Sequence, residues 1–312
     1  MASTVIGSFA PNFKSPTPLP DRKISDPITA TIKKMALSKQ PRALLFDVFG
    51  TCVDWRSTVT QALFDACHVA LNSASSSVAS RTRMKATDMS MEEWGSFAQG
   101  WRNTYKEFTR KIANDSTLPV KTVDQHHLDS LNELLALWEL ESLWNPQELR
   151  AISLIWHHLQ PWGEAEMGIK ALNTVFWTCT LSNGNISLLS DLKVYAKLEF
   201  THIFSAEEFG TFKPNQTVYF GAAEKLKISP SECVMVAAHL GDLQAAKSCG
   251  FQTIYVERPL EEDWDSARVD RAKREGFVDL WITSDEDGFV AVAEKLGIDV
   301  TTTRRRRDSN KL

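Results

Sequence analysis

The 312-residue sequence lacks the patterns that mark several large classes of protein. Its five cysteines are an odd number without a CxxC pair, so we expect free thiols in a reducing compartment and not a disulfide framework. No apolar run approaches the roughly 20 residues of a membrane-spanning helix. The net charge of −4 gives no excess of basic residues for nucleic acid. We therefore expect a cytoplasmic protein without membrane or nucleic-acid partners.

Several catalytic motifs are missing as well. The sequence contains no GxSxG nucleophile elbow, no P-loop and no GxGxxG phosphate-binding turn. Two pairs of adjacent histidines, His126-His127 and His157-His158, do not make metal sites, because neighbouring residues on a helix point in different directions. We interpret both pairs as surface or packing residues.

Both ends of the chain differ in composition from the rest. Residues 1–40 are rich in Ser, Thr, Pro and Lys and have no sustained hydrophobic period, which is typical of a flexible leader. Asp21, Asp26 and the prolines argue against an amphipathic basic targeting helix. Residues 301–312 form a basic tail that contains Arg304 to Arg307, and we interpret this tail as a solvated end.

Short apolar runs alternate with helical patterns over most of the chain. This alternation predicts an α/β fold with a doubly wound, Rossmann-like parallel sheet. Helical spacing fills residues 56–161, and we expect an inserted helical cap domain there. The α/β core domain is then residues 41–55 and 162–300. Because the insert leaves the sheet where the first strand ends, we expect it to cover that edge and shield it from water.

Polar residues follow the apolar runs at four places. Parallel sheets bind ligands beyond the carboxyl ends of their strands, so we expect these residues to share one rim. An aspartate that only caps a turn is the alternative at any single strand, but four such ends together favour an active site. The residues are Asp47 and Thr51, Ser182 and Asn183, Lys213, and His239 and Asp242.

The order of these motifs resembles the haloacid dehalogenase superfamily, whose core is a doubly wound sheet of this kind. The resemblance covers about residues 43–55 and 161–259, and the pair Trp101-Arg102 extends it into the helical block. Together the motifs are specific for the superfamily. They are FDVFGT at 46–51, LSNG at 181–184, FKP at 212–214 and the late strand that ends near Asp242.

Two positions separate the branches of the superfamily. Its phosphatases carry a second Asp two residues after the nucleophile, where this chain has Phe49, which cannot protonate a leaving group. They also hold Mg²⁺ with a pair of acidic residues, and this chain has Ala238 at the earlier of these two positions. Both replacements argue against a Mg²⁺-dependent small-molecule phosphatase. That enzyme and a non-catalytic metabolite-binding member stay the alternatives.

The chain resembles instead the L-2-haloacid dehalogenases, a branch that uses no metal and no organic cofactor. In that family the first Asp displaces the halide from carbon, and water hydrolyses the resulting ester. The resemblance implies a hydrolase that acts on the carbon–halide bond of short (S)-2-haloalkanoic acids and gives a 2-hydroxy acid and halide. Its partner would be this small-molecule substrate, and the family also suggests a homodimer.

The resemblance assigns a role to each residue. It implies that Asp47 is the nucleophile, that Arg102 receives the halide, and that Lys213 neutralises charge beside Asp47. Asp242 would orient or activate the hydrolytic water. The resemblance places five more residues around the nucleophile and the substrate: Thr51, Ser182, Asn183, Phe49 and Tyr219.

Three of these assignments have structural alternatives. Arg102 could be a solvated helix arginine, Lys213 an ordinary loop lysine, and Tyr219 a core residue on a helix face. The sequence also departs from the family at two positions. Ala237-Ala238-His239 replaces Ser-Ser-Asn, and Gly241 replaces an aromatic residue, which leaves the size of the substrate open.

His239 is the departure with a chemical consequence. Because its unperturbed pKa lies near neutrality, a histidine can act as general base in ester hydrolysis. We hypothesise that His239, with Asp242 nearby, activates the water. A buried histidine that is hydrogen-bonded for packing is the alternative.

Overall fold

The computed structural model describes residues 37–73, 77–115, 117–119 and 121–300. The last described part of the predicted leader packs on the core: Leu37 is buried, and the backbone N–H of Lys39 donates a hydrogen bond to Gln252. The rest of the predicted leader, residues 1–36, and the predicted basic tail lie outside the described residues.

A six-stranded parallel sheet forms the centre of the described residues, in the order β5-β4-β1-β6-β7-β8. The chain adds strands first on one side of β1 and then on the other, so β1 lies at the switch point where such sheets bind ligands. The predicted doubly wound sheet is confirmed. The strands are β1 (Ala43–Phe46), β4 (Trp177–Ser182), β5 (His202–Ser205), β6 (Cys233–Ala237), β7 (Gln252–Val256) and β8 (Leu280–Ile282).

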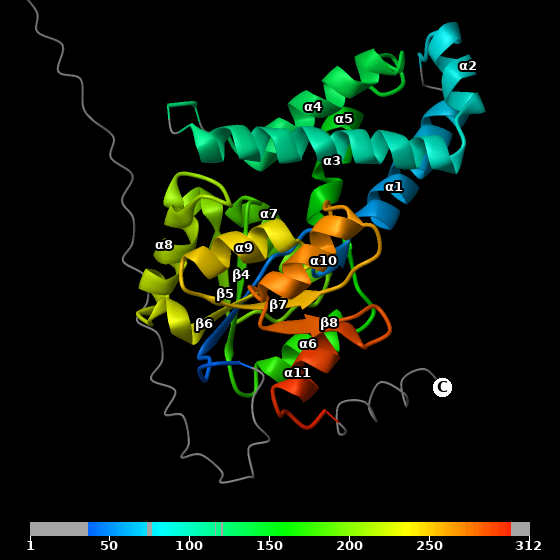
Figure 1. Ribbon diagram of the computed structural model, residues 1–312. Coiled ribbons are helices and arrows are strands. Elements are labelled where there is room, and N and C mark those ends of the chain that lie inside the picture. Colours follow the sequence, from blue (N-terminus) through cyan, green and yellow to red (C-terminus); the bar gives the residue numbers. More distant parts are fainter. Residues whose placement is uncertain (1–36, 74–76, 116, 120, 301–312) are drawn as a thin grey trace, which may run out of the picture. The chain divides into compact units, whose positions relative to one another are not determined.

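Helices cover the sheet on both faces (Figure 1). Helices α6 and α11 pack against each other, and α9 packs on β6 and β7. Strands β1 and β6 are buried throughout, which explains why their sequences are uninterrupted apolar runs. The helices are α6 (Ala165–Leu172), α7 (Ile186–Tyr195), α8 (Gln216–Leu226), α9 (Leu240–Ser248), α10 (Ser266–Glu275) and α11 (Gly288–Lys295), with short 3₁₀ turns η2 (Ala206–Phe209) and η3 (Pro230–Glu232).

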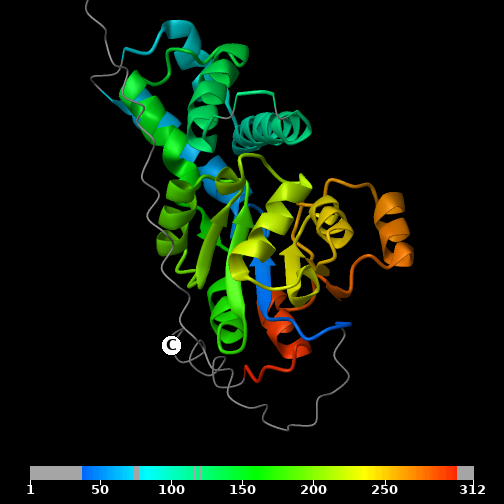
Figure 2. The same ribbon diagram turned by 90° about the vertical axis from the view of Figure 1, so that its left-hand side faces the viewer.

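A helical segment, residues 55–157, interrupts the sheet between β1 and β4. A small antiparallel pair, β2 (Val53–Asp54) and β3 (Gln160–Pro161), joins its two ends. Figure 2 shows β1 pointing toward this segment, so its helices lie beyond the carboxyl end of β1. That it is a separate domain stays a prediction. Its elements are α1 (Trp55–Asn72), α2 (Ser80–Asp88), α3 (Met91–Asn114), α4 (Val123–Leu137), α5 (Pro146–Ser153) and η1 (Leu154–His157).

Helix α3 carries the cationic candidate Arg102. Ser90 begins the helix with a capping box, in which its side chain and that of Glu93 bond each other's backbone N–H groups. This fixed start places Trp94, Trp101 and Arg102 on the buried side of the helix at helical spacing. Arg102 therefore enters the interior with the apolar face of α3.

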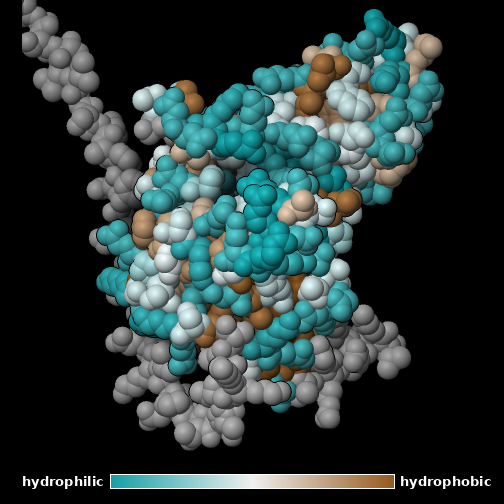
Figure 3. All heavy atoms as spheres, viewed as in Figure 1, coloured by the Kyte–Doolittle hydropathy of each residue, from teal (hydrophilic) through white to brown (hydrophobic). Residues whose placement is uncertain are grey.

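Figure 3 shows that the face seen in Figure 1 is mostly hydrophilic, with hydrophobic residues scattered over it. In the part of the chain that the structure describes, no helix has the length and apolar character needed to cross a bilayer.

Candidate active site

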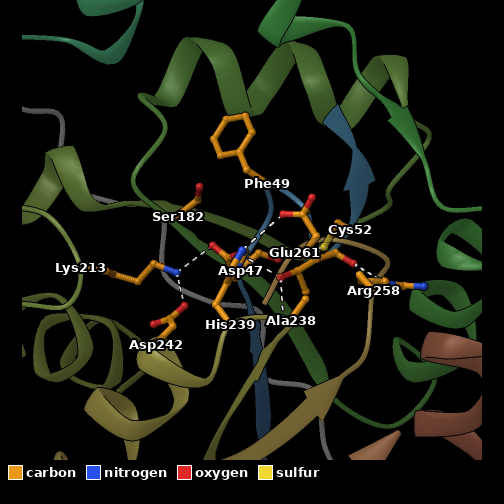
Figure 4. A network of polar contacts seen from close by, with 12 residues as sticks. Asp47, Phe49, Cys52, Ser182, Lys213, Ala238, His239, Asp242, Arg258 and Glu261 are labelled. Atoms are coloured by element: carbon orange, nitrogen blue, oxygen red, sulfur yellow. Dashed lines mark hydrogen bonds and ion pairs between the residues drawn. The ribbon is translucent and has the colours of Figure 1, made fainter. Parts of the chain in front are cut away.

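Asp47 follows β1 directly and receives three polar contacts on its carboxylate. Oδ2 accepts a hydrogen bond from Thr51 Oγ1 at 2.9 Å and lies 3.1 Å from Nδ1 of His239, while Oδ1 accepts from Lys213 Nζ at 3.0 Å (Figure 4). Burial raises the pKa of this carboxyl group, but Lys213 and His239 outweigh burial and hold the pKa far below its usual range. Asp47 is therefore a buried, charged carboxylate.

The turn after Asp47 ties the ends of two strands together. The Thr51 hydroxyl that donates to Asp47 also accepts a hydrogen bond from the backbone N–H of Ala238, at the end of β6, at 2.9 Å. Gly50 has a φ of +86°, a conformation that favours glycine. A Cβ at this position would also lie 1.9 Å from Oε2 of Glu261. The glycine thus admits both the turn and the approach of Glu261.

Replacing Gly50 with alanine should therefore destabilise the protein more than backbone strain alone explains. The strain at positive φ costs about 1–3 kcal/mol, and the new methyl group would have to displace the Glu261 carboxylate. Gly210→Ala is the matched control, because Gly210 also has a positive φ, of +68°, but nothing lies within 4 Å of its would-be Cβ. Urea unfolding of both variants measures the difference, and equal losses would show that Glu261 yields without cost.

Lys213 bridges two carboxylates. Its Nζ lies 3.0 Å from Asp47 Oδ1 and 2.6 Å from Asp242 Oδ2. Burial lowers the pKa of this ammonium group, but Asp242 and Asp47 together raise it above its ordinary value, so Lys213 is charged. Lys213 is buried and is not an ordinary loop lysine.

The side chains of Asn183 and Tyr219 hold this bridge in place. The Asn183 side-chain amide accepts a hydrogen bond from the backbone N–H of Lys213 at 2.7 Å and donates one to its carbonyl at 3.2 Å. Tyr219 OH donates to Asp242 Oδ1 at 2.5 Å. Tyr219 is fully buried on α8, so it is a core residue and a part of the network at once.

His239 lies between two carboxylates, and the second of them was not predicted from the sequence. Its Nδ1 faces Asp47, and its Nε2 lies 3.4 Å from Oε2 of Glu261, in the loop after β7. Burial lowers the pKa of His239, but the two carboxylates raise it to about 9. The backbone N–H of Asp242 donates to the His239 carbonyl at 3.1 Å, but Lys213 and Tyr219 occupy both side-chain oxygens of Asp242. That His239 and Asp242 together activate the water stays a prediction.

The pKa of His239 gives a pH dependence of stability. Since its folded-state pKa of about 9 exceeds the ordinary value of 6.5, protonated His239 stabilises the fold fully below pH 6.5, and this contribution is lost as the pH rises through 9. The loss is at most about 3 kcal/mol. Unfolding in urea between pH 6.5 and 10 should show the decline in wild type and in the exposed control His158→Gln, but a flatter profile in His239→Gln. Parallel profiles for all three proteins would contradict the ion pairs of His239.

Ser182 lies beside this network without entering it. It is fully buried at the end of β4, and its Oγ accepts a weak hydrogen bond from the backbone N–H of Gly184 at 3.3 Å. Figure 4 draws it near Asp47 with no contact to the carboxylate. The expected role of Ser182 toward the substrate stays a prediction.

Arg102 brings a further positive charge into the interior, from the helical segment. It is 4% exposed, so it is not a solvated helix arginine. Its guanidinium group lies 4.6 Å from the ring centre of Tyr105, 5.3 Å from that of Phe49 and 5.5 Å from that of Trp55. Its NH2 donates a long hydrogen bond of 3.4 Å to the Phe49 carbonyl, and Nε has no partner.

No carboxylate among the described residues forms an ion pair with Arg102. A buried charge without a counter-ion is costly, so the arrangement is suited to an anion that is brought in from outside. The aromatic rings around the guanidinium group contribute cation–π attraction but leave its N–H groups available.

The two predicted histidine pairs take no part in the contacts with Asp47. His157 forms ion pairs with Asp124 and Asp191, and His158 is exposed. His126 and His127 are buried, with ring centres 4.3 Å from Phe108 and 4.7 Å from Trp156, which fits the packing interpretation. All five cysteines are free, as predicted. Among the described residues, no group of three or more His, Cys, Asp or Glu side chains is arranged to hold a metal ion.

The donor set at Asp47 does not fit a magnesium ion. Both oxygens of the carboxylate already face N–H or O–H groups, and an ion there would displace the ammonium group of Lys213 or the imidazole of His239. Ala238, where the superfamily's phosphatases carry an acidic residue, supplies a backbone N–H to Thr51 and no side-chain oxygen.

The chain is similar to known haloacid dehalogenases in sequence and in fold. The (S)-2-haloacid dehalogenase 1 of Pseudomonas sp. (strain CBS-3) is 25% identical over 221 residues, which cover 70% of this chain and 85% of that protein. The crystal structure of the L-2-haloacid dehalogenase PA0810 is 31% identical and matches 82% of this chain and all of that one, with a TM-score of 0.64. The defluorinating L-2-haloacid dehalogenase Rha0230 is 26% identical over 84% of this chain and 97% of its own, with a TM-score of 0.66. The model of the haloacid dehalogenase-like hydrolases matches residues 41–250, and the chain belongs to this family.

Proposed function

We propose that the protein is a hydrolytic dehalogenase that converts short (S)-2-haloalkanoic acids to 2-hydroxy acids and halide through an ester on Asp47. The observation that carries this proposal is the buried guanidinium group of Arg102. It lacks a carboxylate partner in the described residues and lies against Phe49, two residues after the nucleophile. A charged carboxylate at the end of β1, and a cation without an ion-pair partner against the turn that follows it, suit a displacement that releases an anion.

In the first step, a carboxylate oxygen of Asp47 attacks C2 of the substrate. The new C–O bond forms as the carbon–halogen bond breaks, and the halide leaves with the bonding electron pair toward Arg102. Lys213 and Thr51 orient the carboxylate for this attack. A halide is the anion of a strong acid and needs no proton, so Phe49 can stand where a phosphatase has its acid.

In the second step, water attacks the carbonyl carbon of the ester. This attack breaks the bond between that carbon and the substrate oxygen, releases the 2-hydroxy acid and restores the Asp47 carboxylate. Because C2 is attacked once, the product has inverted configuration at C2. His239, a partly buried histidine beside Asp47, is the group placed to accept a proton from the water.

The proposal is tested by supplying the purified protein with L-2-chloropropionate and with p-nitrophenyl phosphate, each with and without EDTA. We expect EDTA-resistant chloride release, one 2-hydroxypropionate for each chloride, and no p-nitrophenol. Mg²⁺-dependent release of p-nitrophenol would establish the phosphatase instead. No reaction with either substrate would leave a metabolite-binding member of the family.

The same proposal names the small-molecule partner of the protein, a short 2-halo acid. The charge and the halogen of this acid would lie near the arginine and the aromatic rings around Phe49. A homodimer is proposed by resemblance alone, and light scattering on the purified protein measures it.

A further inference from the structure

The side chain of Glu261 is buried beside the turn that follows Asp47. It is 3% exposed, and the missing side chain of Gly50 leaves room for it there. Figure 4 shows the contact between its carboxylate and the imidazole of His239 as a dashed line. The imidazole is thus held between two carboxylates that come from different strand ends, Asp47 after β1 and Glu261 after β7.

We propose that Glu261 is a positioning residue that holds the imidazole of His239 for hydrolysis of the Asp47 ester. The inference rests on the proposed function. A histidine that acts as base needs a third group to fix its orientation and tautomer. The Nε2···Oε2 distance of 3.4 Å is an ion-pair contact and not yet a hydrogen bond, and such contacts often tighten once substrate is bound.

The reaction itself changes the environment of the imidazole. In the free enzyme His239 carries protons on both nitrogens, because Asp47 and Glu261 are both charged neighbours. When Asp47 becomes an ester, it loses its negative charge. Of the two carboxylates that pair with His239, Glu261 alone is then left, and it favours the tautomer that keeps a proton on Nε2.

The proton balance then follows. Once the ester has formed, Nδ1 releases its proton to solvent, which is the proton that the overall hydrolysis produces. Neutral Nδ1 takes a proton from water as the oxygen of the water bonds to the ester carbonyl carbon. Collapse of this adduct breaks the bond to the 2-hydroxy acid oxygen, which leaves with the proton from the carboxyl group. Asp47 is again a carboxylate and His239 is again doubly protonated.

The loop that carries Glu261 is tied down on three sides, which a positioning role requires. The carboxylate of Glu262 accepts a hydrogen bond from the backbone N–H of Leu240 at 2.8 Å, next to His239. Asp263 pairs with Lys106 of α3 at 2.7 Å. Arg258 Nε donates to the carbonyl of Thr51 at 3.1 Å. The loop is therefore fixed to α9, to the helical segment and to the turn after Asp47.

The test compares Glu261→Gln with the matched control Glu257→Gln, an exposed glutamate at the start of the same loop. Rapid-quench mixing with L-2-chloropropionate separates the two steps. In Glu261→Gln we expect a stoichiometric burst of chloride at nearly the wild-type rate, followed by steady turnover slower on the order of 10²-fold. Intact-protein mass spectrometry should find the ester on Asp47. Glu257→Gln should behave like wild type.

Two further measurements distinguish this positioning role from a merely structural role. Glu261→Asp keeps the charge and should recover part of the hydrolysis rate, and the pH profile of ester hydrolysis should shift in Glu261→Gln but not in the control. If wild type releases halide and Glu261→Gln hydrolyses its ester at the wild-type rate, Glu261 has no such role and the proposed function stands. If wild type releases no halide from any 2-halo acid, both fail. Equal slowing of the burst and of the steady state would mean that Glu261 only supports the fold.

Discussion

Replacing Asp47 with asparagine should abolish dehalogenation, with a loss of at least about 10⁴-fold in chloride release. The amide is not a nucleophile toward carbon under these conditions, so no ester forms and the second step has no substrate. The effect should be larger than that of any other single substitution in the site, because without the nucleophile neither of the two steps can occur. Initial rates with L-2-chloropropionate, together with intact mass after acid quench, measure both parts of the expectation.

The variant should still fold. Lys213 keeps Asp242 as a partner, and His239 keeps Glu261, so neither cation is left without a carboxylate. The matched control is Asp54→Asn, a change of the same kind at the N-cap of α1, where asparagine serves as well as aspartate. Circular dichroism checks the fold of both proteins. Chloride release by Asp47→Asn within tenfold of wild type, with Asp54→Asn unchanged, would remove Asp47 as the nucleophile.

Much of this arrangement follows from the sequence because the signals are local. An apolar run that ends in Asp47, and later runs that end near Ser182 and His239, place their polar residues at one edge as soon as the strands are parallel. Arg102 differs, because its place in the site was implied by the family resemblance, and its position on a helix left a solvated arginine as the alternative. The inferences about the strand ends need only the period of each strand and the rule for parallel sheets.

The parts that could not be predicted depend on how distant segments approach each other. Glu261 lies in an irregular loop, and nothing in its sequence context distinguishes it from Glu262; its place follows from the path of that loop and from the absent side chain of Gly50. Helix α10 was not predicted from the sequence, because Ala272 is its one buried residue. At Gly241, where the family carries an aromatic residue, a Cβ would lie 3.9 Å from the indole nitrogen of Trp264, which the chain brings from elsewhere.

Arg102→Met should lower the activity of the protein without lowering its stability. Removal of the group that receives the halide should lower kcat/KM by about 10²–10³-fold, as loss of one preorganised donor does elsewhere. Stability should hold or rise, because methionine fills the aromatic pocket without burying an unpaired charge. Thermal unfolding and chloride release on the same preparation measure the two effects.

Arg110→Met is the matched control for this substitution, since Arg110 lies two turns further along α3 and is exposed. It should leave both activity and stability nearly unchanged. A further reading concerns the product: bromide should inhibit wild type and Arg110→Met by occupying the place of the leaving halide, whereas Arg102→Met should have lost this inhibition. If Arg102→Met instead keeps its activity and loses stability, the guanidinium group has a counter-ion or a packing role in solution. The halide would then leave by another path, and the observation on which the proposed function rests would no longer support it.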